Sequence, residues 1–125
     1  MQKIEGTTIK VNRGDVLSFS LSLENEDETP YTFQEGDKII FSIYNKKALN
    51  EKAVLIKEVE ATSGETSISI NCTKEDMTIG ELINKEVEYW YEIELNGEHT
   101  IIGYDDTGAK ILMLYPEGSK IQWEV

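Results

Sequence analysis

The strongest strand signal in the sequence is VEYWYEIEL at residues 87–95, followed directly by Asn96-Gly97. Apolar side chains recur at every second position of this segment, which is typical of a β-strand with one face in the core. Asn-Gly favours the positive φ angles of a two-residue hairpin turn. We therefore predict that residues 100–104 return alongside residues 87–95.

The same periodicity predicts strands through the rest of the chain. Residues 16–23 alternate apolar side chains with serine, and residues 38–44 are apolar on both faces, which favours a central strand. Turn chemistry separates the segments. This spacing predicts an all-β, antiparallel sandwich of seven to nine strands. The further strands are expected at residues 7–11, 53–59, 66–70, 110–115 and 121–125, with 53–59 and 66–70 forming a hairpin.

One short helix is expected between the sheets. Thr73-Lys74-Glu75-Asp76 places a capping residue three positions before a carboxylate that can accept from free backbone N–H groups. Gly80 limits this helix to about two turns. We interpret the segment as the crossover between the two sheets.

Length and composition indicate a single globular domain covering residues 1–125. Hydrophobic residues make up 39% and charged residues 29% of the chain, and no linker or repeat divides it. The single cysteine, Cys72, excludes an internal disulfide and favours folding in a reducing cytoplasm. Residues 1–20 show no signal peptide, and no stretch approaches the ~20 apolar residues of a membrane span.

The chain is strongly acidic, with 24 Asp and Glu residues against 12 Lys and Arg residues and a net charge of −12. This charge repels phosphate backbones and anionic lipid head groups, so we expect neither nucleic acid nor a membrane as a partner. The charge either serves solubility or complements a basic partner or a cation.

Most residue patterns that catalysis requires are missing. His99 is the only histidine, and the nine glycines are scattered singly, without a phosphate-binding loop. The acidic segments 24–28 and 105–106 lack the alternate spacing of a calcium loop and are expected to be solvated turns. We therefore predict no enzyme activity, no cofactor and no catalytic or metal-binding residue, although a carboxylate pair of the glycosidase type stays open.

Three segments of the sequence are candidates for binding surfaces. Arg13-Gly14-Asp15 matches an integrin-binding motif, but Gly-Asp between strands is also ordinary turn chemistry, which we favour. Trp90 lies on the face opposite the tyrosines of its strand, so either a loop covers it or it anchors a partner or a sugar. The segment 110–115 is apolar on both faces, which calls for a covering loop or another subunit. The predicted interface residues are Trp90, Ile111, Leu112, Met113, Leu114 and Tyr115.

Several motifs, taken in order, resemble the N-terminal immunoglobulin-like domain of phage and prophage baseplate upper proteins. The resemblance spans about residues 7–115 and departs from the family pattern at residues 83–86, because a glycine is usual there. The segments that carry it are residues 8–15 (TIKVNRGD), 31–33 (YTF), 35–39 (EGDKI), 73–76 (TKED), 89–95 (YWYEIEL) and 100–103 (TIIG).

The resemblance implies an immunoglobulin-like fold and a non-catalytic structural role in a phage or prophage tail or baseplate, supporting host attachment. The partners that it implies are other tail or baseplate proteins, with a homo-oligomer as a second option. The location that it implies is the virion tail, after synthesis in the bacterial cytoplasm. The alternative is a carbohydrate-binding or adhesin-type sandwich, in which Trp90 stacks on glycans.

Overall fold

The computed structural model of the protein describes residues 2–45 and 52–117, which form nine strands and no helix. The all-β prediction is thus confirmed. The predicted strand at residues 121–125 lies outside the described residues, and no described segment is a helix that could cross a membrane. The strands are β1 (Gln2–Glu5), β2 (Thr8–Asn12), β3 (Leu17–Ser22), β4 (Lys38–Asn45), β5 (Leu55–Glu60), β6 (Ser67–Cys72), β7 (Val87–Leu95), β8 (His99–Ile102) and β9 (Lys110–Tyr115).

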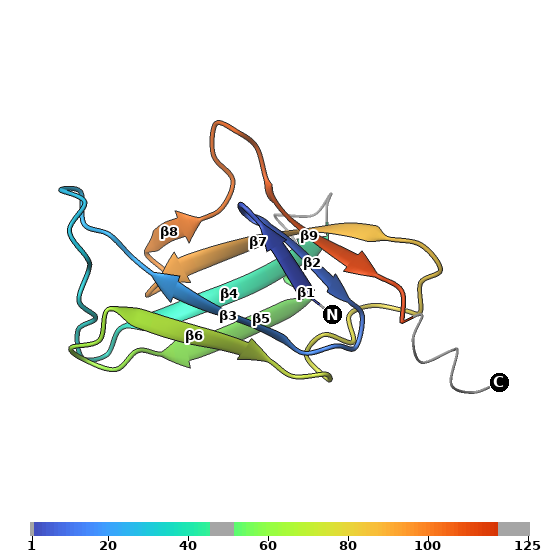
Figure 1. The fold of residues 1–125 in the computed structure, drawn as a ribbon, viewed down its shortest axis with the longest axis horizontal. Helices are drawn as coiled ribbons and strands as arrows, with labels where there is room; N and C mark the ends of the chain where they lie inside the picture. The colour runs from blue at the N-terminus through green and yellow to red at the C-terminus, as the bar shows by residue number, and fades with distance from the viewer. Residues whose placement is uncertain (1, 46–51, 118–125) are drawn as a thin grey trace.

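The strands form two sheets that share one core (Figure 1). The larger sheet has the order β1-β2-β9-β7-β4-β5, and β8 pairs with the end of β7 that β9 leaves free. The smaller sheet contains β3 and β6. Among the described strands every pair is antiparallel except β2 and β9, which run parallel, so the predicted antiparallel sandwich is corrected to a mixed one. Parallel neighbours need a long connection, and here most of the chain separates the two strands.

The core lies between the two sheets and is built from alternate residues of their strands. Phe19 of β3 packs edge-on against Phe41 of β4, with ring centroids 5.4 Å apart, and Phe41 also contacts Tyr91 of β7. Tyr89 and Tyr91 are both buried. The predicted alternation of β7 is therefore confirmed, and Trp90 lies on the face that points away from the core.

The predicted hairpin turn after β7 is also confirmed. Asn96 and Gly97 both have positive φ angles, 57° and 70°, as a tight hairpin requires. The Asn96 side chain accepts from the backbone N of Lys38 at 2.8 Å and donates to Asp37 at 3.0 Å. The turn is therefore fixed to the start of β4.

The predicted short helix is wrong, because residues 73–76 make only one turn. The cap does form: the Asp76 N donates to Thr73 Oγ1 at 3.1 Å, and the Thr73 N donates to Asp76 Oδ2 at 2.9 Å. Met77 and Ile79 are both buried, a spacing of two that suits extended backbone, and Gly80 then adopts a φ of 63°. The chain therefore crosses to β7 instead of adding a second helical turn.

The predicted hairpin between residues 53–59 and 66–70 is wrong as well. β5 is an edge strand of the larger sheet and β6 belongs to the smaller one, so the two do not pair. In the link between them, the Gly64 N donates to Phe33 O at 3.0 Å, and the Phe33 N donates to Glu65 O at 2.9 Å. These bonds hold the link against the segment before β4, so the chain passes from the larger sheet to the smaller one at this point.

Candidate functional site

The outer face of the larger sheet presents apolar side chains on three neighbouring strands. In the strand register Tyr44 of β4 lies beside Trp90 of β7, and Trp90 lies beside Ile111 of β9. Met113 and Tyr115 follow on the same face of β9, and all five residues are half-buried. We call Tyr44, Trp90, Ile111, Met113 and Tyr115 the outer row.

Trp90 is partly covered by the loop between β8 and β9. Its ring centroid lies 6.1 Å from that of Tyr104, with the planes tilted by 57°, and its Nε1 donates to Glu88 Oε2 at 3.1 Å. Tyr104 is 62% exposed, so the pair leaves aromatic surface accessible. A loop residue thus packs on the Trp90 ring, and Trp90 as a whole is half-buried.

The predicted interface on β9 is corrected for two of its residues. Leu112 and Leu114 have no exposed surface. In the register Leu112 lies between Ile9 of β2 and Tyr89 of β7, both of which are core residues. β9 is apolar on both faces because its inner face belongs to the core, and only its outer face contributes to the outer row.

Carboxylates border the outer row on β7. Glu88, Glu92 and Glu94 share the outer face of this strand with Trp90. Partial burial raises the pKa of Glu92, and the neighbouring charge of Glu94 raises it further. Half-buried aromatic residues beside an acidic border are the arrangement expected of a surface that binds an apolar patch with basic neighbours.

A shallow hollow of about 320 Å³ is lined in part by Tyr104. Thr100, Asp105 and Lys110 contribute polar groups to its lining. Lys110 Nζ donates to Asp105 Oδ1 at 2.8 Å, and this bond holds the pKa of Asp105 well below its usual range. The hollow therefore combines an aromatic face with hydroxyl and charged groups, as polar ligands require.

Arg13 is a structural residue in this fold. Its buried guanidinium donates to the carbonyl oxygens of Ile79 at 2.8 Å and Gly80 at 2.7 Å, and to the Glu117 carboxylate at 2.6 Å. A guanidinium held in this way is not presented to a receptor. The geometry therefore supports the turn interpretation of Arg13-Gly14-Asp15.

The remaining candidate residues lie apart from one another. His99 is exposed at the start of β8, whereas Cys72 is fully buried in the smaller sheet, where burial raises the pKa of its thiol to about 11. Asp27 and Asp105 each accept a hydrogen bond from the backbone N–H two residues later, as local turns do. Within the described ranges, no group of three or more His, Cys, Asp or Glu side chains is placed to hold a metal ion.

No family model, no curated protein and no solved structure matches this chain. Its function is therefore inferred from its own surfaces. The outer row brings together four of the six interface residues predicted from the sequence, namely Trp90, Ile111, Met113 and Tyr115. The outer row also contains Tyr44, which was not predicted. The apolar residues on both faces of its strand are the sequence signal that could have indicated it.

Proposed function

We propose that the chain is a non-catalytic, immunoglobulin-like interaction module that docks to other proteins through the outer row. The observation that carries this proposal is the adjacency of apolar side chains on β4, β7 and β9. Partly exposed aromatic residues commonly anchor protein interfaces, and charged residues commonly form their rim.

The strand arrangement supports the immunoglobulin-like part of the proposal. In chain order, β3 and β6 correspond to strands B and E of an immunoglobulin domain, which share one sheet. β4, β5 and β7 then correspond to strands C, C′ and F of the other sheet, and β8 with β9 to strand G. Because this fold serves many functions, the surface and not the fold indicates the function.

We assign the module to the tail or baseplate of a phage or prophage, where it would hold neighbouring virion proteins. The order of motifs across residues 7–115 supports this assignment. Purified particles test it: the protein should co-purify with assembled tails through a density gradient. Recovery of the protein in the free fraction alone would overturn the virion assignment and leave the docking surface to be tested separately.

The docking surface is tested by measuring the affinity of the chain for each protein encoded beside its gene. Trp90→Ala should weaken the complex at least tenfold, because an aromatic anchor contributes about 2 kcal/mol or more to binding. Val16→Ala is the matched control, since Val16 is 57% exposed directly before β3 of the smaller sheet, away from the outer row. Equal effects of both variants would contradict the assignment of the outer row.

The second candidate function is carbohydrate binding, which the exposed Tyr104 beside Trp90 and the polar hollow next to it favour. Tyr104→Ala should then abolish retention on a glycan array, whereas Trp90→Ala should only weaken it. Absence of any glycan signal for the native chain would eliminate this candidate.

A further inference from the structure

The smaller sheet has an open edge along β3, which pairs with β6 on one side. The side chain of Gln2 marks the other side: it donates to Ser18 O at 2.6 Å and accepts from Ser18 N at 2.8 Å. The backbone groups of Ser18 therefore face away from β6. Because backbone direction alternates along a strand pair, Ser20 and Ser22 face the same way.

No described residue pairs with the backbone of Ser20 or Ser22 on this side. Exposed edges are usually protected by lysine, proline, a bulge or a covering segment. The β3 sequence, LSFSLS, contains neither lysine nor proline, and its register with β6 is regular. The edge beyond Gln2 is thus available to another strand.

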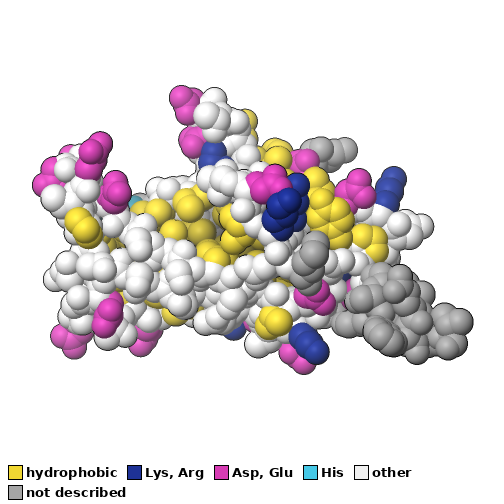
Figure 2. Space-filling view, in the orientation of Figure 1, with side chains coloured by type: hydrophobic (Ala, Val, Ile, Leu, Met, Phe, Trp, Pro, Cys, Tyr) yellow, Lys and Arg dark blue, Asp and Glu magenta, His cyan; other side chains and the backbone are white. Residues whose placement is uncertain are grey.

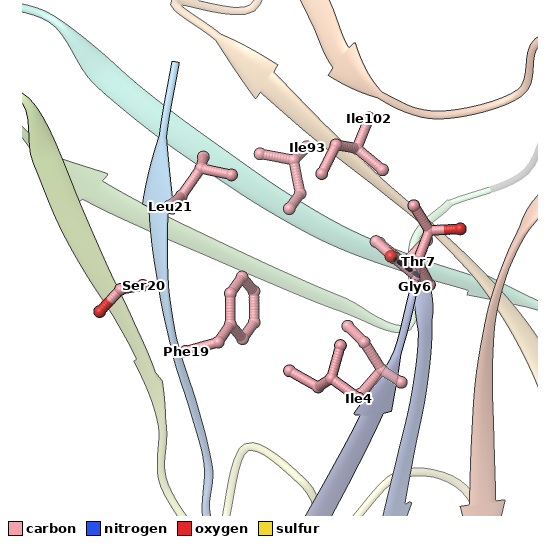
Figure 3. A pocket seen from close by; sticks show the side chains of 10 residues that line it. Ile4, Gly6, Thr7, Phe19, Ser20, Leu21, Ile93 and Ile102 are labelled. Atoms are coloured by element: carbon pink, nitrogen blue, oxygen red, sulfur yellow. Dashed lines mark hydrogen bonds between the residues drawn. The ribbon is translucent and has the colours of Figure 1, made fainter. Parts of the chain in front are cut away.

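An apolar groove of about 150 Å³ lies beside this edge. Phe19 and Leu21 point into it from β3, facing Ile4, Ile93 and Ile102 across the groove (Figure 3). The side chains of β3 that face the groove are thus apolar, while those between them point away. Figure 2 shows hydrophobic side chains exposed at the middle of this face. A cavity of this size accommodates about one benzene-sized group.

The groove lies at the edge of the core, where the two-stranded smaller sheet ends. Tyr91 and Ile93 of β7 line it, and both are core residues of the larger sheet. Both are almost fully buried, whereas Phe19 and Ile102 are half-buried and Ile4 is exposed, so the open surface of the groove lies on these three side chains. A third strand beside β3 would cover this surface and pair with the open edge at the same time.

The surroundings of the open edge are acidic. Residues 24–28, just after β3, carry four exposed carboxylates, and acidic side chains are visible on the projecting loops of this face (Figure 2). A second copy of the chain would bring the same loop and a further net charge of −12. Charge complementarity therefore favours a basic partner over self-pairing. The carboxylates belong to Glu24, Glu26, Asp27 and Glu28.

We propose that the open edge of β3 and the groove bind an extended, basic segment of another protein. Its backbone pairs with Ser20 and Ser22, one large apolar side chain fills the groove, and lysine or arginine residues lie near the loop after β3. In such strand addition the main-chain bonds supply affinity and the groove selects the side chain. This site is separate from the outer row, so it gives the module a second contact.

A labelled synthetic peptide tests the proposal by fluorescence anisotropy. The probe alternates threonine and valine around a central phenylalanine and carries lysines at its ends. The native chain should bind it saturably below about 1 mM. Replacing the lysines by glutamate, or the phenylalanine by alanine, should each weaken binding at least tenfold, because each removes one of the two selective contacts.

Ser20→Pro removes the outward N–H and should weaken peptide binding at least tenfold, while leaving the ladder to β6 intact. Ser69→Pro is the matched control, because Ser69 lies opposite Ser20 and faces the other edge of the same sheet. Ile4→Trp, which fills the groove from its 42% exposed rim, should weaken binding without touching β3. Thermal melting verifies that each variant folds.

Three results would overturn the proposal: no binding by the native chain, equal loss in Ser20→Pro and Ser69→Pro, or a native dimer that Ser20→Pro dissociates. The last result would mean that a second copy occupies the edge. Trp90→Ala should leave peptide binding unchanged. The proposal can therefore fail while docking through the outer row stands, and the reverse also holds.

Discussion

The Arg13 side chain ties three distant segments of the chain together. It bonds to the crossover at Ile79 and Gly80 and to Glu117 after β9. Arg13→Ala leaves these groups without their donor and should lower the free energy of unfolding by about 3–5 kcal/mol. Urea denaturation measures the change. Arg13→Lys keeps the charge but not the planar guanidinium, so its stability should lie between those of the native protein and Arg13→Ala. A loss below about 1 kcal/mol in Arg13→Ala would contradict this role.

Asp37 makes part of the stability depend on pH. It accepts from Asn96, from the Tyr31 hydroxyl and from the Gln34 N, and these bonds hold its pKa below the usual range. A lowered pKa in the folded state stabilises the fold above the unfolded value, near pH 4, and this contribution is lost as pH falls through the folded pKa.

We therefore expect Asp37→Asn to reduce stability at pH 7 and to flatten the decline of stability as the pH falls below about 4. Chemical denaturation at a series of pH values measures both effects. Glu35→Gln, an exposed change in the same turn, serves as the control. A parallel shift of the whole stability curve in Asp37→Asn would show that the carboxylate is not responsible.

Sequence alone predicted the direction of individual side chains better than their partners. Alternation placed Tyr89 and Tyr91 in the core and Trp90 outside, because side-chain direction in a strand is a local property. The partners of Arg13 lie 66 and 104 positions away along the chain, and no local pattern encodes such distances.

At the scale of elements, the crossover after β6 is stabilised by its cap and not by helical length. Asp76 accepts from Thr73 N and from Lys57 Nζ, the latter at 3.0 Å, so it also ties the crossover to β5. Asp76→Ala should cost about 1–2 kcal/mol, as the loss of a cap does. Thermal or urea unfolding measures it, with the exposed Glu75→Ala as the control. Far-ultraviolet circular dichroism should show no loss of helix, because the native fold forms only one turn there.

Strand existence was predictable, whereas strand pairing was only partly so. Periodicity identified the positions of β2 to β9, although it missed β1, whose four residues are all exposed and carry no apolar alternation. Residues 53–59 and 66–70 read as a hairpin because alternation does not reveal which sheet a strand joins. The hydrogen bonds of Phe33 to Gly64 and Glu65 direct β6 to the smaller sheet, and they connect segments far apart in the sequence.

At the scale of the whole molecule, Cys72 reports on opening of the sandwich. Its thiol is fully buried between the sheets, and its pKa of about 11 leaves little thiolate at pH 8. Reaction with a thiol reagent should therefore be slow in the native protein and complete in urea. The labelling rate should rise in Arg13→Ala by about tenfold for each 1.4 kcal/mol of stability lost, because labelling follows the population of the open state. Rapid, stoichiometric labelling of the native chain would contradict a closed core around Cys72.

Both proposed surfaces depend on the assembled molecule, which limits what sequence can predict of them. The β9 part of the outer row was found because its apolar residues are contiguous. The groove joins β1, β2, β3, β7 and β8, and no strand contributes more than three of its lining residues. Its sequence signal is limited to the serine alternation of β3, which fits an exposed outer face as well as an open edge.

The parallel pairing of β2 with β9 has a mechanical consequence. A force that pulls β2 toward its N-terminal end and β9 toward its C-terminal end slides the two strands along each other. Their register from Ile9 to Asn12 is then loaded in shear, with all its hydrogen bonds sharing the force. β1 pairs antiparallel with β2 and would peel away first, one bond at a time. Pulled along this axis, the domain should lose β1 at low force and then resist further extension at the β2–β9 pair.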